Sequence, residues 1–141
     1  MHRNLPILAL IVFSLVDSVP AAEPSAVEMN RLLGRGINFG NCLEAPKEGE
    51  WGLKIEKEYV QKVKEAGFGS VRIPIRWSAH AAKEAPYTID PAFFDRVDQL
   101  LEWTQSQSLP TIINIHHYEE LYRDPAKEEP RFLALWKQIA E

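Results

Sequence analysis

The chain has little cysteine and no excess of positive charge, and both facts exclude broad classes of protein. Cys42 is the single cysteine among 141 residues, so the sequence has no internal disulfide framework and no cysteine-rich zinc site. The formal net charge of −4 leaves no basic stripe, and nucleic acid is therefore not an expected partner. Apolar residues make up 45% and charged residues 26% of the chain, which is typical of a globular protein with a hydrophobic core.

The chain also lacks an apolar run long enough to span a membrane. Its longest such stretch covers residues 5–16 and is closed by Asp17, whereas a spanning helix needs about 20 residues. Arg3 precedes this stretch, and small residues follow it, with possible cleavage after Ala21 or Ala22. This order is typical of a secretory signal peptide. We therefore predict a signal peptide over residues 1–22, a mature part over residues 23–141, and a secreted or periplasmic protein without a membrane partner. An uncleaved anchor or a buried helix is the alternative for the N-terminal segment.

The mature part repeats a strand followed by a helix. Apolar segments predict strands over residues 36–41, 70–75 and 111–115, and their spacing is that of one βα unit in an eight-unit barrel. No Gly-rich phosphate loop occurs in the first predicted strand or after it. The predicted fold class is α/β, as the first three βα units of a (β/α)8 TIM barrel, and a doubly wound open sheet is the alternative. Three units cannot close a barrel, so we expect this chain to be the N-terminal part of a longer protein.

Helices are predicted after each strand. The first covers residues 56–66 with Gly67 as its stop, the second begins with Asp90 as cap and Pro91 as first residue, and the third begins near Pro130. The apolar positions expected on their buried faces recur at helical spacing. They are Ile55, Tyr59, Val63 and Ala66, then Phe93, Phe94, Val97, Leu100, Leu101 and Thr104, and then Phe132, Leu133, Trp136, Ile139 and Ala140.

Two histidines stand directly after the third predicted strand. His116 and His117 follow the apolar run Thr111–Ile115, and polar side chains in such a position are costly to bury without partners. Ligands of α/β proteins bind at the carboxyl ends of parallel strands. The second strand carries Arg72 inside an apolar run, and a guanidinium there needs a carboxylate and several acceptors. We therefore predict a site at this edge of the sheet.

Several segments resemble glycoside hydrolase family 5, the cellulase family. They are Gly34-Arg35-Gly36-Ile37-Asn38-Phe39-Gly40-Asn41, Ser70-Val71-Arg72-Ile73-Pro74-Ile75-Arg76-Trp77, Ile113-Asn114-Ile115-His116-His117 and residues 130–140. The resemblance covers residues 31–141. It implies a TIM barrel and a retaining glycosidase that uses two carboxylates about 5 Å apart. It also implies that the acid/base glutamate lies in an Asn-Glu-Pro motif, and this chain contains no Asn-Glu pair.

The expected function is therefore part of a secreted endoglucanase that cleaves β-1,4-glucan and acts as a monomer. Neither catalytic carboxylate is expected within this chain, which should be inactive by itself. Another family 5 specificity, such as mannanase or exo-glucosidase, is one alternative. A non-catalytic carbohydrate-binding half-barrel is another.

The resemblance assigns roles to individual side chains. It implies that Arg72 and His116 support the reacting centre, Arg72 by holding the nucleophile ionised. It adds His117 to the sugar-binding residues. Among nearby side chains we expect Tyr118, Asn41 and Trp77 to contact sugar, while core packing or turn capping is the competing interpretation for each. Glu44 is expected either at the rim of the site or as a turn cap.

No cofactor and no metal ion is expected. His116, His117, Glu119 and Glu120 are close in sequence and could together hold a metal ion. Neighbouring residues on a strand point to opposite faces, so the two histidines should not share one ion. On this argument we predict a sugar-binding site without metal.

Overall fold

The computed structural model describes residues 23–141, so the predicted signal peptide lies outside the described residues and stays a prediction. No helix within residues 23–141 is both long and apolar enough to cross a membrane. The elements in chain order are α1 (Ala26–Leu33), β1 (Gly36–Asn38), α2 (Lys57–Glu65), β2 (Ser70–Ile75), the 3-10 helix η1 (Trp77–His80), α3 (Pro91–Ser106), β3 (Thr111–Ile115), α4 (Glu119–Arg123) and α5 (Pro125–Ala140).

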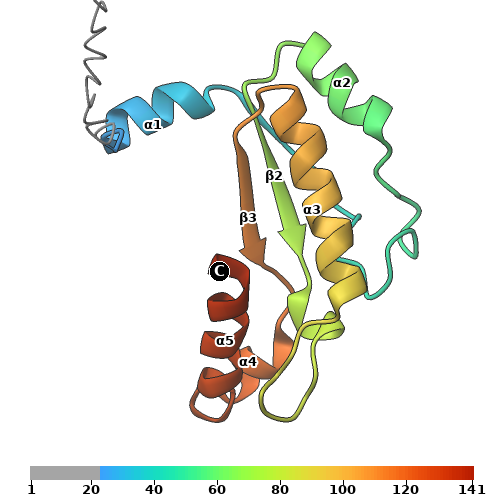
Figure 1. Cartoon of the computed structure of the whole chain (residues 1–141), viewed down its shortest axis with the longest axis vertical. Helices are drawn as coiled ribbons and strands as arrows, with labels where there is room; N and C mark the ends of the chain where they lie inside the picture. Colours follow the sequence, from blue (N-terminus) through green and yellow to red (C-terminus); the bar gives the residue numbers. More distant parts are fainter. Residues whose placement is uncertain (1–22) are drawn as a thin grey trace, which may run out of the picture.

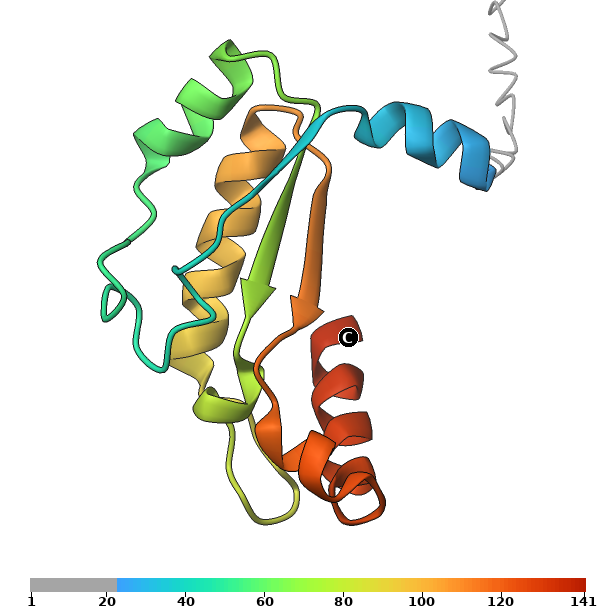
Figure 2. The ribbon, with the colours of Figure 1, turned by 180° about the vertical axis from the view of Figure 1, so that it is seen from behind.

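The three strands form one parallel sheet in the order β1-β2-β3. The second and third strands have the predicted bounds, whereas β1 ends at Asn38 instead of Asn41. Helix α3 covers one face of the sheet, and the other face has no helix across it (Figures 1 and 2). Three βα units in a parallel sheet confirm the predicted α/β class.

The side chains of β2 alternate between the two faces of the sheet. Val71, Ile73 and Ile75 are at most 1% exposed, since they lie in the core below the helices. The residues between them, Arg72 and Pro74, point to the opposite face because strand side chains alternate. In the register, Arg72 lies between Asn38 of β1 and Ile112 of β3. Ile112 is 42% exposed, so this second face is open beside Arg72, whereas Pro74 is buried.

Helix α3 begins as the sequence predicts. The Asp90 side chain accepts a hydrogen bond from the backbone N–H of Ala92 at 3.0 Å, and Pro91 occupies the first helical position, where its missing N–H costs nothing. The residues that this helix buries completely or nearly so are Phe93, Val97, Leu100 and Thr104. They were all expected on its apolar face.

Two other helices differ from prediction. In α2 the buried residues are Val60 and Val63, while Tyr59 is 40% exposed. The buried face of α2 therefore includes Val60 in place of the predicted Tyr59. Helix α5 begins at Pro125 and runs through Pro130. Asp124 caps it by accepting from the backbone N–H of Lys127 at 3.2 Å. Phe132 and Ile139 pack against the core as predicted, but the buried residues are Arg131 and Leu135, and Leu133 is 57% exposed.

Helices α1 and α4 were not predicted. Helix α1 has a capping box in which Ser25 and Glu28 exchange hydrogen bonds, a pattern that stabilises helix starts. None of its residues is buried, and it extends away from the sheet (Figure 1). Helix α4 is only five residues long and packs on α5.

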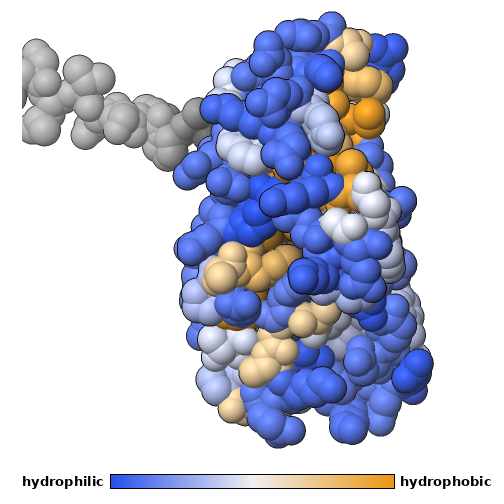
Figure 3. Space-filling view, turned by 90° about the vertical axis from the view of Figure 1, so that its right-hand side faces the viewer, coloured by the Kyte–Doolittle hydropathy of each residue, from blue (hydrophilic) through white to orange (hydrophobic). Residues whose placement is uncertain are grey.

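We expect this chain, expressed by itself, to aggregate or to form a loosely packed state that binds the dye ANS. Apolar patches interrupt its hydrophilic surface (Figure 3), and Val27, Leu32, Ile112 and Leu133 are each at least 42% exposed. Strands β1 and β3 each have a single neighbour among the described residues, so both have free edges. The measurement is ANS fluorescence with gel filtration and calorimetry. A monomer with a sharp, cooperative thermal transition and no ANS binding would contradict this prediction.

Candidate functional site

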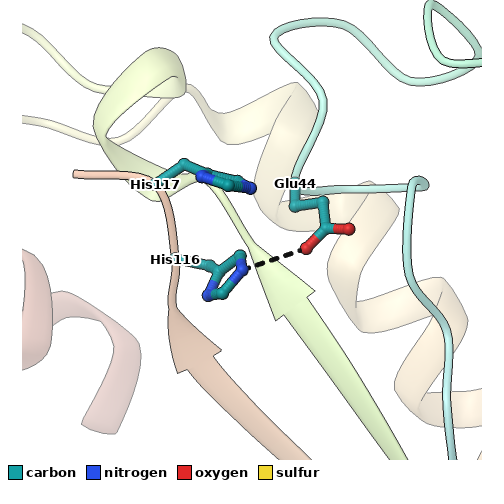
Figure 4. Close-up of side chains that lie close together, drawn as sticks. All are labelled: Glu44, His116 and His117. Atoms are coloured by element: carbon teal, nitrogen blue, oxygen red, sulfur yellow. Dashed lines mark ion pairs between the residues drawn. The ribbon is translucent and has the colours of Figure 1, made fainter. Parts of the chain in front are cut away.

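Two backbone hydrogen bonds at the carboxyl end of β2 bring the site together. The N–H of Arg76 donates to the carbonyl of Leu43 at 2.9 Å, and the N–H of His116 donates to the carbonyl of Ile75 at 2.8 Å. These bonds fix the loop after β1 on one side of β2 and the end of β3 on the other. Glu44 and His116, far apart in sequence, therefore lie next to each other (Figure 4).

The Glu44 carboxylate is held at both oxygens. The N–H of Asn41 donates to Oε1 at 2.6 Å, and Oε2 lies 3.2 Å from Nε2 of His116. Asn41 adopts a positive φ of 63°, which asparagine tolerates better than most residues. Glu44 is 8% exposed, and both contacts offset the cost of burying its charge. This glutamate is a central residue of the site and not only part of its rim.

The chain turns sharply at His117, and this turn changes the expected geometry. His117 has a φ of 51°, so the strand alternation ends at this residue. The His116 and His117 rings consequently lie with their centroids 4.3 Å apart, and both lie beside the carboxylate of Glu44 (Figure 4). The argument that the two histidines point to opposite faces was wrong. A ligand atom from each of these three side chains lies within 4.8 Å of the other two, so these are the described residues that could hold a metal ion.

The surroundings of His116 favour its neutral form. Its pKa is lowered from the ordinary value first by burial, and further by His117 and Arg72, while Glu44 opposes the shift. The side-chain amide nitrogen of Asn114 lies 3.4 Å from Nδ1 of His116. An amide N–H there donates to Nδ1, so Nε2 carries the ring proton and donates to Glu44. The hydrogen-bonded side chains of His116 and Glu44 thus offer a ligand both hydrogen-bond donors and acceptors.

Arg72 lies on the open face of β2. Its Nη1 donates to Oδ1 of Asn38 at 2.6 Å, and no carboxylate of residues 23–141 forms an ion pair with it. The carboxylate partner predicted for this guanidinium is therefore not among the described residues, and its role toward a nucleophile stays a prediction. Asn38 is a partner that sequence reasoning missed, although the parallel register sets the two residues opposite each other.

A second charged pair lies beside His117. Nη2 of Arg76 donates to Oε2 of Glu119 at 2.9 Å, and the other oxygen of Glu119 lies 3.9 Å from Nδ1 of His117. Trp51 presents its ring edge-on to His117 with centroids 5.6 Å apart, and it is 41% exposed. Strand alternation from Arg72 could have placed Arg76 on the open face, but its pairing with Glu119 depends on the loop after β3.

Two of the predicted sugar contacts are wrong. Trp77 is 1% exposed and packs against Phe93 and Phe94. Tyr118 is 2% exposed, its hydroxyl donates to Glu128 at 2.6 Å, and its ring lies against the Arg131 guanidinium. Neither ring has a free face for a sugar, because both belong to the core that supports the site. Asn41 and His117 remain accessible and stay predicted contacts.

The loop between β1 and α2 is tied to α3 by Arg96. This guanidinium binds both oxygens of Glu48 at 2.8 and 2.6 Å, and it also donates to the carbonyl of Ile55 at 2.7 Å. Its plane lies over the Trp103 ring, 5.1 Å from the centroid. A bidentate pair of this kind fixes geometry as well as charge. The loop that carries Glu44 and Trp51 is thereby anchored.

Comparison with known proteins gives a consistent answer. A family model described as Cellulase (glycosyl hydrolase family 5) matches residues 34–141. Endoglucanase H of Acetivibrio thermocellus is 46% identical over 125 residues, which are 86% of this chain and 14% of that protein. A structure of Thermotoga maritima Cel5A in complex with mannotriose superposes with a TM-score of 0.79 and 57% identity, over 80% of this chain and 37% of that chain. A second structure of Cel5A, in complex with cellobiose, matches with the same values.

The similar structures are TIM-barrel enzymes, and the three βα units described above form a part of such a barrel. The chain spans 14% of the length of Endoglucanase H and 37% of Cel5A. It therefore corresponds to a minority of each relative.

Substitutions at Glu44 and Arg72 should move the pKa of His116 in opposite directions. Glu44→Gln removes the carboxylate that favours the protonated ring, so the pKa should fall further below its ordinary value. Arg72→Ala removes a nearby positive charge, so the pKa should rise. NMR titration of ring-labelled histidine in the intact protein measures both shifts. Shifts of the same sign, or none, would show that these side chains do not set the charge of His116.

Proposed function

Because the chain belongs to glycosyl hydrolase family 5, the cellulase family, we propose that it forms part of a secreted retaining endoglucanase acting on β-1,4-glucan. The curated relative named above, Endoglucanase H, carries this activity in its name. The proposal extends their activity to the protein that contains this chain. Export rests on the predicted signal peptide over residues 1–22.

The observation that carries the proposal is the cluster of Glu44, His116 and His117. These side chains lie at the carboxyl end of a parallel sheet, where barrel enzymes have their active sites. A buried carboxylate bonded to a neutral imidazole offers both acceptors and donors for sugar hydroxyl groups, which are themselves donors and acceptors. The rings of His116 and His117 are each more than a third exposed at the side chain, so a ligand can reach them.

In the proposed mechanism this part of the protein binds and orients the sugar. A retaining glycosidase forms and then hydrolyses a glycosyl-enzyme bond with two carboxylates. We assign those two carboxylates to residues outside this chain. His116 and Glu44 hold hydroxyl groups of the sugar next to the reacting bond, and Arg72 supplies the positive charge that keeps the nucleophile ionised. Trp51 adds an exposed aromatic surface beyond His117.

A mannan is the second candidate substrate. Cel5A of Thermotoga maritima has been crystallised with mannotriose and with cellobiose, and this chain resembles both structures equally. Gluco- and manno-configured sugars differ in the orientation of one hydroxyl group. Relative kcat/KM on cellotetraose and mannotetraose would decide between the two substrates.

Arg72→Ala should lower both kcat and kcat/KM of the intact enzyme while leaving its fold nearly unchanged. A carboxylate that loses a neighbouring cation holds its proton to higher pH, so the acidic limb of the rate profile should move to higher pH. Arg72→Lys is the matched control and should restore little activity, because an ammonium lacks the planar fork of the guanidinium. Wild-type kinetics for Arg72→Ala would show that this residue is structural.

His116→Ala should lower kcat/KM of the intact enzyme by roughly 10- to 1000-fold, the loss of one or two strong hydrogen bonds. Strand alternation alone would aim His117 away from His116, and His117→Ala would then cost less. The turn at His117 places both rings in the site, so we now expect a comparable loss. Activity should survive dialysis against EDTA. Full activity of His116→Ala, or recovery of EDTA-treated enzyme only on adding a divalent ion, would refute the sugar-binding assignment.

A further inference from the structure

The same three side chains that we assign to sugar binding also have the composition of a metal site. Glu44 Oε2 and His116 Nε2 are 3.2 Å apart, which is close to the spacing of two ligands on one ion. A ligand atom of His117 lies within 4.8 Å of both. Two imidazoles and one carboxylate, with a position left open, form the ligand set of many catalytic zinc sites.

We propose that Glu44, His116 and His117 bind a divalent transition-metal ion, with Zn²⁺ as the reference ion, and that this ion competes with the sugar. Imidazole nitrogens suit zinc, copper and nickel, whereas magnesium and calcium prefer oxygen ligands throughout. The competition rests on the proposed function, because it requires the sugar to occupy the same atoms. The ion is an inhibitor and not a cofactor.

The ligands are held in place before any ion binds. His117 keeps a positive φ of 51°, a conformation that is strained in a residue other than glycine and persists only where the surrounding structure holds it. This turn is what brings its ring to the side of Glu44. The Asn41 N–H fixes the second oxygen of Glu44. Binding therefore requires adjustment of side-chain torsions and no movement of the backbone.

Asn114 can serve as the outer partner of His116. Binding of an ion at Nε2 moves the ring proton to Nδ1, and metal-bound histidines donate that proton to a neighbouring acceptor. The Asn114 amide already lies 3.4 Å from Nδ1. Its Oδ1 is buried without a hydrogen-bond partner. Rotation of the amide presents this oxygen to the new N–H and gives up the hydrogen bond from Nδ2 to the carbonyl of Ile115.

The surrounding charges limit the affinity. Arg76 is neutralised by Glu119, but Arg72 has no carboxylate partner among the described residues, and its charge acts on His116. A cation in the site is thus partly repelled. We expect an exchangeable ion that chelators remove and that a high sugar concentration displaces.

The test is isothermal calorimetry of Zn²⁺ on the intact, EDTA-treated protein, followed by inhibition kinetics. One site is expected in the wild type, and both Glu44→Gln and His117→Ala should weaken Zn²⁺ binding by at least roughly tenfold, since each removes one of three ligands. Glu120→Gln is the matched control. It removes an exposed carboxylate outside the cluster and should leave binding unchanged. Zn²⁺ should raise the apparent KM and leave kcat unchanged, and added cellobiose should weaken Zn²⁺ binding.

Three results would overturn the proposal. They are no binding of Zn²⁺ to the wild type, binding that Glu44→Gln and His117→Ala leave unchanged, and inhibition that lowers kcat without raising KM. Failure of the sugar-binding assignment gives a different result. In that case His116→Ala hydrolyses substrate like the wild type and cellobiose does not affect Zn²⁺ binding, yet calorimetry still shows an ion that requires Glu44 and His117.

Discussion

The site depends on the way β2 holds both of its neighbours beyond the point where the strands end. At its carboxyl end the backbone accepts a hydrogen bond from His116 and donates one to Leu43. These two bonds align three segments that are far apart in sequence. Glu44 and the two histidines lie at or directly after these hydrogen-bonded positions. Their side chains meet because the two backbone hydrogen bonds hold the segments side by side.

Buried aromatic residues make this alignment rigid. Trp77 follows Arg76, the first residue after β2, and Tyr118 directly follows the histidines. Both aromatic residues are at most 2% exposed. Each therefore fixes the chain immediately after a polar residue of the site. Arg131 supports the same region from α5, where it donates to the carbonyls of Ser78, Ala81 and Ala82. Buried side chains of the core thus support the polar residues at the carboxyl end of the sheet directly.

The sequence was sufficient for the features that depend on local pattern. Strands β2 and β3 were predicted with correct bounds because each is mainly apolar, apart from Arg72 and Asn114, and each is followed directly by a polar residue. Helix α3 was predicted because its cap and first proline are local signals. The start of α5 was missed, because Pro130 looks like a helix start when the capping role of Asp124 is not recognised.

The composition of the site was predicted better than its geometry. His116, His117 and Arg72 were selected from their places at and within apolar strands. For Trp77 and Tyr118 the sequence left sugar contact and core packing open, because an aromatic residue after a strand can turn toward solvent or toward the core, and the packing of distant helices decides which. The turn at His117 was missed for a similar reason, since a positive φ outside glycine is imposed by tertiary contacts.

The anchoring of the β1–α2 loop by Arg96 has a consequence for protein engineering. The guanidinium binds Glu48 and the carbonyl of Ile55, so it divides the loop into a segment before Glu48 that carries Glu44 and a short span between the two anchors that carries Trp51. A Cβ atom added at Gly49 or Gly52 would contact nothing within 4 Å, so the span is loosely surrounded. Gly49 and Gly52 have positive φ values of 88° and 81°, which residues with a Cβ rarely adopt, and Leu53 packs against the core. Libraries that keep these three residues and vary positions 50 and 51 can thus change the aromatic surface beyond His117 while the carboxylate beside the histidines stays in register.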